Sequence, residues 1–528
     1  MMTKFTRVLT LATASMLVLS SVAGCSKPAT DNGSTGTPST SVEANQTINL
    51  EGYPIVPERI DLTAFAYGEP GQGSWDDYPV FKELAEKTNV FVDFETVSGD
   101  GATEKLNLVL ASNKLPDMFF SGLSSSMINK YAGMGLFMPL NDLIDQYAPN
   151  ISALLAERPD IKKAITMPDG NIYSIPAVNA TAGQATTQLC INKTWLDKLG
   201  LEVPTTTDEF YEVLKAFKTQ DPNGNGKADE IGMSYEPVPP YDVWNGDTGF
   251  SGAFGVVTLT GSMMLNNDQS ELIYTPVQEG YKEYIKWTST LYTEGLLDTE
   301  LFTQDHNQYM AKVSSDYLGA YLTNGPIAGG ACEFIAIEPL AGPDGTKLWS
   351  QFDYSIDKNR AIISATCSNP AAAMRYIDSF FEKEHSLKLR YGNRLEARGD
   401  QWEIMPSEPG AQSECPSAYV PTLETVEIKT QDLIQTPDGI AADERQAMYA
   451  PYLAPYVPNM NLTPEESKEL SALQTDLQDF VNLNKAKWTT GQNNIDAEWD
   501  KYVAQLNQMG LTRYMEIYNG AYQRYLGN

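Results

Sequence analysis

The amino-acid sequence predicts an α/β protein with a helix-rich C-terminal part. Strand and helix patterns alternate between residues 60 and 120, and two long amphipathic runs follow near the C-terminus, at 463–484 and 497–525. The 528 residues are enough for two large lobes or for three domains. Apolar residues make up 42% and charged residues 20%, proportions that exclude a collagen-like or wholly disordered chain.

The alternating region is typical of a parallel sheet that is covered by helices. Val80, Phe81 and Leu84 share one face of a predicted helix, and the segment after it alternates as a strand does. In chain order, the segments are a strand at 60–66, a helix at 79–87, a strand at 89–97, a helix at 103–112 and an apolar strand at 115–120. We expect a second unit of this kind from about residue 188 onwards.

A further helix is predicted after Pro204. Thr206 and Glu209 have the spacing of a capping box, in which each side chain accepts from a backbone N–H of the other residue. The apolar face of this helix consists of Phe210, Val213, Leu214 and Phe217. A strand at 231–235 is expected to follow.

The N-terminus has the features of an export signal. Lys4 and Arg7 precede an apolar run at 8–19, which is too short to span a bilayer core of about 30 Å. Val22-Ala23-Gly24-Cys25 then resembles a bacterial lipobox, so residues 1–24 are predicted to be a lipoprotein signal peptide and Cys25 the lipid-bearing residue. An ordinary signal peptide with an incidental cysteine is the alternative. The Ser/Thr/Gly/Pro-rich segment 25–46 is expected to be a flexible tether.

Charge and composition exclude several classes of function. The net charge of −31 repels phosphate backbones, so we expect no nucleic-acid partner. With only two histidines, His306 and His385, the chain offers no histidine-rich metal centre. The four cysteines after the tether are Cys190, Cys332, Cys367 and Cys415, and their spacing fits no zinc motif. They could be free thiols or include one disulfide, and the sequence does not decide between these alternatives.

A candidate calcium loop follows the capping-box helix. Residues 221–230 (DPNGNGKADE) place oxygen-bearing side chains at loop positions 1, 3, 5 and 9 and a glycine at position 6, as the first part of an EF-hand does. Position 12 is Gly232 rather than the usual glutamate, so Glu230 is expected to supply the closing carboxylate. The predicted ligands are Asp221, Asn223, Asn225, the backbone carbonyl of Lys227, Asp229 and Glu230. A polar Asn/Gly turn without an ion is the alternative; with one fixed loop, we expect a structural ion rather than a sensor.

Many aromatic residues lie in loops rich in Gly, Pro and Asn, where aromatic planes can stack on the C–H faces of sugars. On this ground Trp75, Trp244 and Trp349 are candidate ligand contacts, although packing in the core is the alternative for each. Motifs of nucleophile elbows, dinucleotide or nucleotide loops and zinc proteases are absent from the sequence. Among the 68 acidic residues nothing in the spacing singles out a carboxylate pair of the glycosidase kind. We expect a protein that binds its ligand and is not an enzyme.

Residues 195–230 (WLDKLGLEVPTTTDEFYEVLKAFKTQDPNGNGKADE) resemble the family 1 extracellular solute-binding lipoproteins, the long carbohydrate-binding type of Gram-positive bacteria. Leu115-Pro116-Asp117, the 366–370 segment TCSNP and the C-terminal GLTRY and YQRY agree with this resemblance. This sequence departs from the family at two places. It has Asn192-Lys193-Thr194 where many members carry Arg-Lys-Asp, and residues 391–395 differ from the Tyr-Gly-Ile-Glu-Gly of many members. Both departures are expected near the meeting of lobes and cleft, so the ligand need not be the commonest of the family.

The resemblance implies two α/β lobes with a hinge, an interlobe cleft for an oligosaccharide, a calcium ion at the loop, and an ABC importer of two permeases and an ATPase as partner. It implies an extracellular, lipid-anchored monomer. We expect the lobes to divide the chain into 47–185 (lobe 1), 186–325 (lobe 2), 326–400 (a return to lobe 1) and 401–528 (lobe 2 and hinge-spanning helices). A surface glycosidase or lyase with a carboxylate pair, a sensor or adhesin of the same fold, and a peptide or modified-nutrient ligand are the alternatives.

Overall fold

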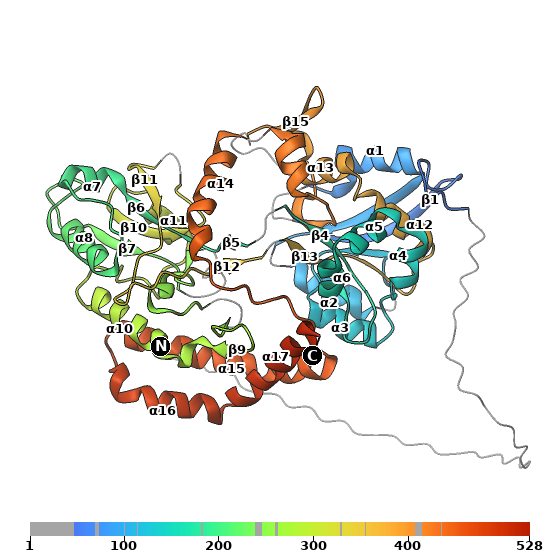
Figure 1. Ribbon diagram of the computed structural model, residues 1–528. Coiled ribbons are helices and arrows are strands. Elements are labelled where there is room, and N and C mark those ends of the chain that lie inside the picture. The colour runs from blue at the N-terminus through green and yellow to red at the C-terminus, as the bar shows by residue number, and fades with distance from the viewer. Residues whose placement is uncertain are drawn as a thin grey trace, which may run out of the picture. The chain divides into compact units, whose positions relative to one another are not determined.

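Two mixed β-sheets organise the chain in the computed structural model (Figure 1). The structure describes residues 47–68, 73–99, 101–112, 114–180, 183–237, 245–258, 262–327, 330–353, 355–406, 414–434 and 436–527. The predicted signal peptide, the tether and Cys25 lie outside these residues. No helix within the described ranges combines the length and the apolar character that crossing a membrane would require.

The first sheet has the strand order β2-β1-β3-β13-β4. β1 pairs in parallel with β2 and β3, whereas β13 is antiparallel to both β3 and β4. The strands are β1 (Ile60–Tyr67), β2 (Val90–Val97), β3 (Met118–Phe120), β4 (Ile175–Val178) and β13 (Ile356–Ile363). The expected strand–helix–strand rhythm of residues 60–120 is therefore present.

Helices cover this sheet because each has one apolar face. In α1 (Pro79–Thr88), Val80, Phe81 and Leu84 are buried, and Asn89 ends the helix in the left-handed conformation at φ 60°. The other helices of this lobe are α2 (Ala102–Ala111), α3 (Ser125–Gly133), α4 (Asn141–Tyr147), α5 (Pro149–Glu157), α6 (Pro159–Ile165), α12 (Pro370–Ser379) and α13 (Lys383–Tyr391).

The second sheet has the order β11-β6-β10-β7. β10 is parallel to β7 and antiparallel to β6, which also pairs with β11. Its strands are β6 (Gln188–Asn192), β7 (Ile231–Ser234), β10 (Leu318–Thr323) and β11 (Phe334–Ile337), and a separate hairpin consists of β8 (Met263–Leu265) and β9 (Leu272–Tyr274). Its helices are α7 (Lys193–Leu199), α8 (Thr207–Thr219), α10 (Glu279–Thr293) and α11 (His306–Val313). The capping box of Thr206 and Glu209 is present at the start of α8.

The chain passes between the two sheets through a short ribbon, β5 (Gln184–Ala185) paired with β12 (Gln351–Phe352) (Figure 1). We expected the chain to return to lobe 1 at residue 326. Instead, β11 still pairs with β6 of the second sheet, so the return follows β12 and leads into β13. An apolar strand fits either sheet by its pattern, and this pairing is fixed only by long-range hydrogen bonds.

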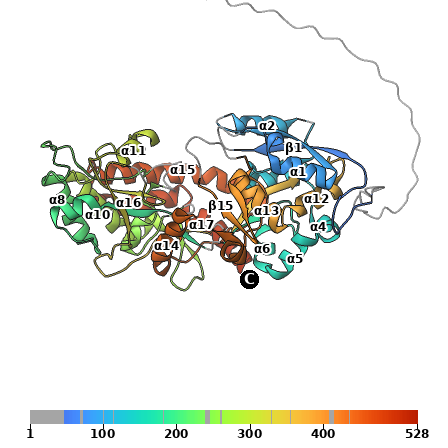
Figure 2. The same ribbon diagram turned by 90° about the horizontal axis from the view of Figure 1, so that it is seen from above.

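The C-terminal part forms a small sheet and four helices (Figure 2). We expected one run at 497–525, but Gly510 at φ 105° breaks it, because a left-handed residue cannot continue an α-helix. The elements are β14 (Leu395–Arg398), β15 (Gln401–Ile404), β16 (Leu433–Ile434), α14 (Pro437–Tyr449), α15 (Pro464–Thr489), α16 (Ile495–Gln508) and α17 (Leu511–Leu526).

Helix α15 connects the two lobes. Just before it, the Asn129 side chain of α3 donates to the Leu462 carbonyl at 2.6 Å. Near its other end, Lys485 forms an ion pair at 2.7 Å with the buried Asp247 of lobe 2. With 26 residues, α15 is about 39 Å long, which is enough to reach from one lobe to the other.

Asp117 links three segments of lobe 1. Its carboxylate accepts from the backbone N–H and hydroxyl of Thr63 in β1 at 2.8 and 2.9 Å, and from those of Ser368 at 2.7 and 3.0 Å. Burial disfavours the ionised form, but these hydrogen bonds outweigh it and hold the pKa of Asp117 below its ordinary value.

We predict that Asp117→Ala lowers the free energy of unfolding by about 2 kcal/mol, because it leaves the donors of Thr63 and Ser368 unpaired. Urea unfolding at pH 7 measures this. Since the folded-state pKa is lowered, the difference between wild type and variant should shrink as the pH falls through that pKa. Asp268→Ala, which removes an exposed turn carboxylate, is the control; equal losses in the two variants would contradict the prediction.

Candidate functional site

The 221–230 loop forms a tight nest between α8 and β7. The side chains of Asn223 and Asn225 both donate to the Asp229 carboxylate, at 3.2 and 3.1 Å. The carboxylate of Asp221 accepts from the backbone N–H groups of Asn225 and Gly226, each at 3.1 Å. Four of the six predicted calcium ligands therefore lie within hydrogen-bond distance of one another.

Three residues of this loop have a left-handed backbone conformation. Asp221, Gly224 and Gly226 have φ angles of 46°, 75° and 75°, and such left-handed residues let successive groups face the same centre. Outside the loop, Lys218 of α8 donates to the Glu230 carbonyl at 2.6 Å. The loop is thereby held to the end of α8 and the start of β7.

Glu230 has an unsatisfied acceptor in this loop. The residue is 1% exposed, and its Oε1 has no hydrogen-bond partner among the described residues. Burial and the charges of Asp229 and Asp221 raise the pKa of Glu230 above its ordinary value. A buried carboxylate oxygen without a donor, beside an all-oxygen ligand set, fits a hard cation such as calcium. Within the described part of the chain, no three or more His, Cys, Asp or Glu side chains are arranged to hold a metal ion. A metal site in this loop would therefore need the oxygens of Asn223 and Asn225 as well.

A second candidate site lies where the strands of the first sheet end. Ser121 follows β3 with φ 59°, a left-handed conformation that few non-glycine residues adopt. Its hydroxyl accepts from Arg360 at 2.9 Å and donates to the Tyr419 carbonyl at 2.7 Å. The ring of Tyr419 lies 6.1 Å from that of Tyr67 at the end of β1. Aromatic, hydroxyl and guanidinium groups thus meet at this edge.

The second sheet presents polar groups at the corresponding edge. Glu236 follows β7 and is buried, and its carboxylate contacts His306 Nδ1 at 3.0 Å and accepts from the Asn245 side chain at 2.6 Å. Below it, Lys312 binds the buried Asp298 at 2.7 Å. In open α/β sheets, ligands bind outside the carboxyl ends of the parallel strands. The two edges, on either side of the β5–β12 ribbon, therefore form the candidate ligand site.

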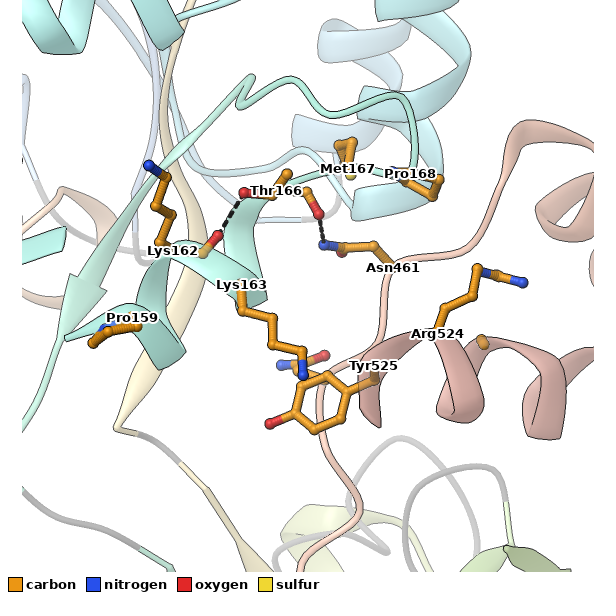
Figure 3. Close-up of a pocket in the computed structure, with 11 residues that line it drawn as sticks. Pro159, Lys162, Lys163, Thr166, Met167, Pro168, Asn461, Arg524 and Tyr525 are labelled. Carbon is orange, nitrogen blue, oxygen red and sulfur yellow. Dashed lines mark hydrogen bonds between the residues drawn. The ribbon is translucent and has the colours of Figure 1, made fainter. Parts of the chain in front are cut away.

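Two cavities lie beside the crossing segments. One, of about 530 Å³, is lined by the end of β4 and by α5, and includes Asn179, Ser355 and Glu424. The other, of about 500 Å³, lies between α6, the 459–461 segment and α17 (Figure 3). In Figure 3, Lys163 points toward Tyr525, with its ammonium 4.5 Å from the ring centroid. Asn461 donates to the carbonyls of Ala164 and Thr166 and so closes the end of α6.

The structure places two of the three predicted tryptophan contacts in the core. Trp75 is fully buried and stacks on Phe81 at 5.6 Å. Trp349 is 1% exposed, and its indole N–H donates to the Thr187 carbonyl at 2.6 Å. Both therefore support the packing alternative, because neither ring is open to a ligand. Trp244 lies outside the described residues.

Sequence analysis did not single out the residues at the strand ends. Arg360, Tyr419 and Glu236 are far apart in the chain, and only the strand pairing brings them to the two edges. A signal was available for Glu236 alone, which directly follows the predicted strand at 231–235; no strand was predicted beside Arg360 or Tyr419. The cysteine question is answered for the described residues, since Cys190, Cys332, Cys367 and Cys415 form no disulfide with one another.

The chain forms two helix-covered sheets and crosses between them repeatedly, with polar groups at the strand ends of each sheet. This arrangement is that of a two-lobe binding protein. Residues 67–385 match the family model described as bacterial extracellular solute-binding protein. The chain belongs to the bacterial extracellular solute-binding protein family. Since this is a family of binding proteins, the expectation that the chain is not an enzyme is confirmed.

The relatives include proteins named for carbohydrate transport. FusA of Streptococcus pneumoniae, a fructooligosaccharide ABC transporter substrate-binding protein, is 30% identical over 480 residues, or 85% of this chain and 87% of FusA. The structure of FusA in complex with kestose superposes with a TM-score of 0.79 at 28% identity and covers 89% of this chain and 100% of that one. A FusA EF-hand mutant in complex with fructo-nystose has a TM-score of 0.78 at 27% identity and covers the same shares.

Two Bacillus subtilis proteins are also similar. The lipoprotein LipO is 27% identical over 404 residues, or 72% of this chain and 71% of LipO. The polygalacturonan/rhamnogalacturonan-binding protein YtcQ is 26% identical over 281 residues, or 51% of this chain and 53% of YtcQ. The names of FusA and YtcQ thus cover both neutral and acidic saccharides.

The burial of the two tryptophans yields a prediction. Trp75→Ala and Trp349→Ala should each lower the free energy of unfolding by about 3–5 kcal/mol, because each leaves a large cavity in a packed core. Chemical denaturation of the soluble body, residues 47–528, measures the loss. Trp402→Ala is the control, since Trp402 is only partly buried on the small β14–β15–β16 sheet. A loss below about 1 kcal/mol at either core position would contradict the structure, by the same scale of cavity costs.

Proposed function

We propose that this protein is a receptor for an ABC importer: it captures an oligosaccharide between its two lobes and delivers it to two permease subunits and their ATPase. The observation that carries this proposal is the match to FusA, which extends over most of both chains and places the same two-lobe fold around a sugar ligand in that relative. The agreement spans both lobes and the crossings, so it concerns the whole binding machinery and not one domain.

The chemistry of the two strand-end edges supports a saccharide. Sugars offer hydroxyls for hydrogen bonds and C–H faces for aromatic rings, and the first edge carries Tyr67, Tyr419 and Arg360. The second edge carries Glu236 and His306, whose side chain is 34% exposed. Closing the lobes would bring the two sets onto one ligand and exclude water, and the importer would then bind the closed state.

We propose in addition that the 221–230 loop holds a structural calcium ion. Asp221, Asn223, Asn225, Asp229 and Glu230 would supply side-chain oxygens and Lys227 its carbonyl. The bound ion would offset most of the charge of the three carboxylates and give Glu230 Oε1 its missing partner. The solved EF-hand mutant of the relative FusA supports this assignment, since it indicates that FusA carries an EF-hand. In this chain the loop residues already face one another, so binding would orient amide oxygens inward rather than refold the loop.

The proposed location is the outer face of the cell membrane. Cys25 after the 1–24 signal would carry the lipid, the 25–46 segment would serve as a tether, and the folded body would act as a monomer. The relative LipO is named a lipoprotein, which supports an anchor of this kind. Radiolabelled palmitate incorporation by the wild type, and its loss in Cys25→Ser, tests the anchor.

Ligand binding is tested by calorimetry on the soluble body with kestose, nystose, a neutral glucose-based trimer and a galacturonate trimer. We expect one saccharide class to bind with a dissociation constant in the micromolar range or below and to raise the unfolding midpoint by at least ~2 °C at about 100 times that constant. No new products should appear on chromatography after incubation with the bound sugar. A broad panel without any heat or thermal shift would contradict the proposal, and so would turnover of a bound sugar.

Calcium binding is tested by thermal unfolding with EDTA and with added calcium. Saturating calcium should raise the midpoint of the wild type by at least ~2 °C, and Asp229→Ala and Glu230→Gln should abolish the response. Asp268→Ala removes a carboxylate from another Asn/Asp turn, which binds Ser270 within the turn, and should respond as the wild type does. A wild type that is indifferent to both EDTA and calcium would contradict the assignment.

A further inference from the structure

Arg445 differs from the other arginines of the structure. Within the described residues its guanidinium makes no ion pair and no hydrogen bond, and its Nε is buried without a partner. Every other described arginine donates to a carboxylate or to a backbone carbonyl; the pairs are formed by Arg59, Arg158, Arg360, Arg375, Arg390, Arg398, Arg513 and Arg524, and Arg394 donates to Met405. In a chain of net charge −31, an arginine without a carboxylate partner requires an explanation.

Arg445 is held in place by its neighbours on α14. The next residue, Gln446, accepts from the backbone N–H of Ala185 in β5 at 2.9 Å. One turn later, the hydroxyl of Tyr449 accepts from the Leu189 N–H at 2.8 Å and donates to the Ile337 carbonyl at 2.6 Å. Arg445 therefore sits on a rigid turn of α14, fixed both to the interlobe ribbon and to the second sheet.

The guanidinium lies against Gly325, in the segment directly after β10. A Cβ atom at Gly325 would be only 3.1 Å from Nη2 and 3.3 Å from Nε of Arg445, and the φ of Gly325 is 154°. This glycine thus leaves the room in which the guanidinium lies. Since β10 is parallel to β7, its carboxyl end is on the same edge as Glu236, the edge that we assign to the ligand.

A half-buried guanidinium without a partner is unfavourable, because part of its water shell is lost and nothing replaces it. Its planar fork of donors matches two neighbouring oxygens, such as vicinal hydroxyls or a carboxylate. A saccharide carries both kinds of oxygen pair, so the ligand of the proposed function can supply the missing partners.

We propose that Arg445 is a specificity-determining contact of the ligand site and donates in a bidentate manner to a pair of adjacent oxygens on the captured saccharide. This inference rests on the proposed function and adds to it. It makes α14, which contacts both the ribbon and the second lobe, a part of the ligand site and not only a connection between lobes.

The test compares Arg445→Gln, Arg445→Met and Arg445→Lys with the wild type, using the saccharide that the calorimetric panel identifies. We expect all three variants to lose affinity by about tenfold or more, since glutamine and methionine remove the charged donors and lysine lacks the fork. Their unfolding midpoints without ligand should stay at or above that of the wild type, because the side chain makes no polar contact that the fold would lose. Arg398→Gln is the matched control; Arg398 is exposed and paired with Glu396 and Glu403, and its loss should leave affinity unchanged.

The salt dependence of binding distinguishes a pair of hydroxyls from a carboxylate as the partner of Arg445. Binding of a neutral trimer such as kestose should change little between about 50 and 500 mM NaCl, whereas binding of a galacturonate trimer through a carboxylate should weaken in the wild type and lose this dependence in Arg445→Gln. Wild-type affinity within twofold in all three Arg445 variants would overturn this inference and leave the proposed function intact. Absence of any saccharide binding by the wild type would overturn the proposed function itself, and the inference with it.

Discussion

The structure depends on one long-range constraint: the first sheet is incomplete without β13. This strand lies between β3 and β4 and hydrogen-bonds to both, yet it comes from residues 356–363, after the whole second sheet. The first lobe therefore cannot be completed until the chain has left it and returned. This requirement places β5 and β12 side by side as the ribbon between the lobes. Two short paired strands, together with α14 and α15, connect the lobes, and each lobe keeps its own core. Such a connection would let the proposed closure proceed as a rotation about the ribbon.

Charged groups inside the fold are of two kinds, those that pair with each other and those that have no partner. Some cations of this acidic chain form buried ion pairs. In the Arg375–Asp378 pair of α12, Asp378 also accepts from the N–H of Ile151 at 2.8 Å. Burial outweighs these partners and raises the pKa of Asp378 to about 6. The buried polar atoms without a partner in the described part of the chain include Nε of Arg445 and Oε1 of Glu230. Both belong to charged groups at the two proposed sites, where a ligand or an ion would supply the partner.

Local patterns determined how much of this could be predicted. The helix at 79–87 and the capping box of Thr206 and Glu209 depend on residues near in sequence, and both were predicted correctly. The partner of β11 depends on hydrogen bonds to a strand about 140 residues earlier, a separation beyond the reach of any local pattern. Trp75 and Trp349 show a second limit, because an aromatic residue beside Gly and Pro has the same local sequence whether it is buried or exposed. The Arg445 contact could not be predicted, since its unpaired state is visible only when every neighbour has been placed.

The 221–230 loop and the proposed ligand edge lie at opposite ends of β7. The loop precedes this strand of four residues, and Glu236 follows it. Lys218 holds the loop to α8, and β7 pairs with β10, whose carboxyl end leads to Gly325. An ion that fixes the amino end of β7 would therefore also fix the position of the polar groups at its carboxyl end, because a strand held in a sheet transmits displacement along its length. A structural ion at one edge and a saccharide at the other would in this way be coupled without any contact between them.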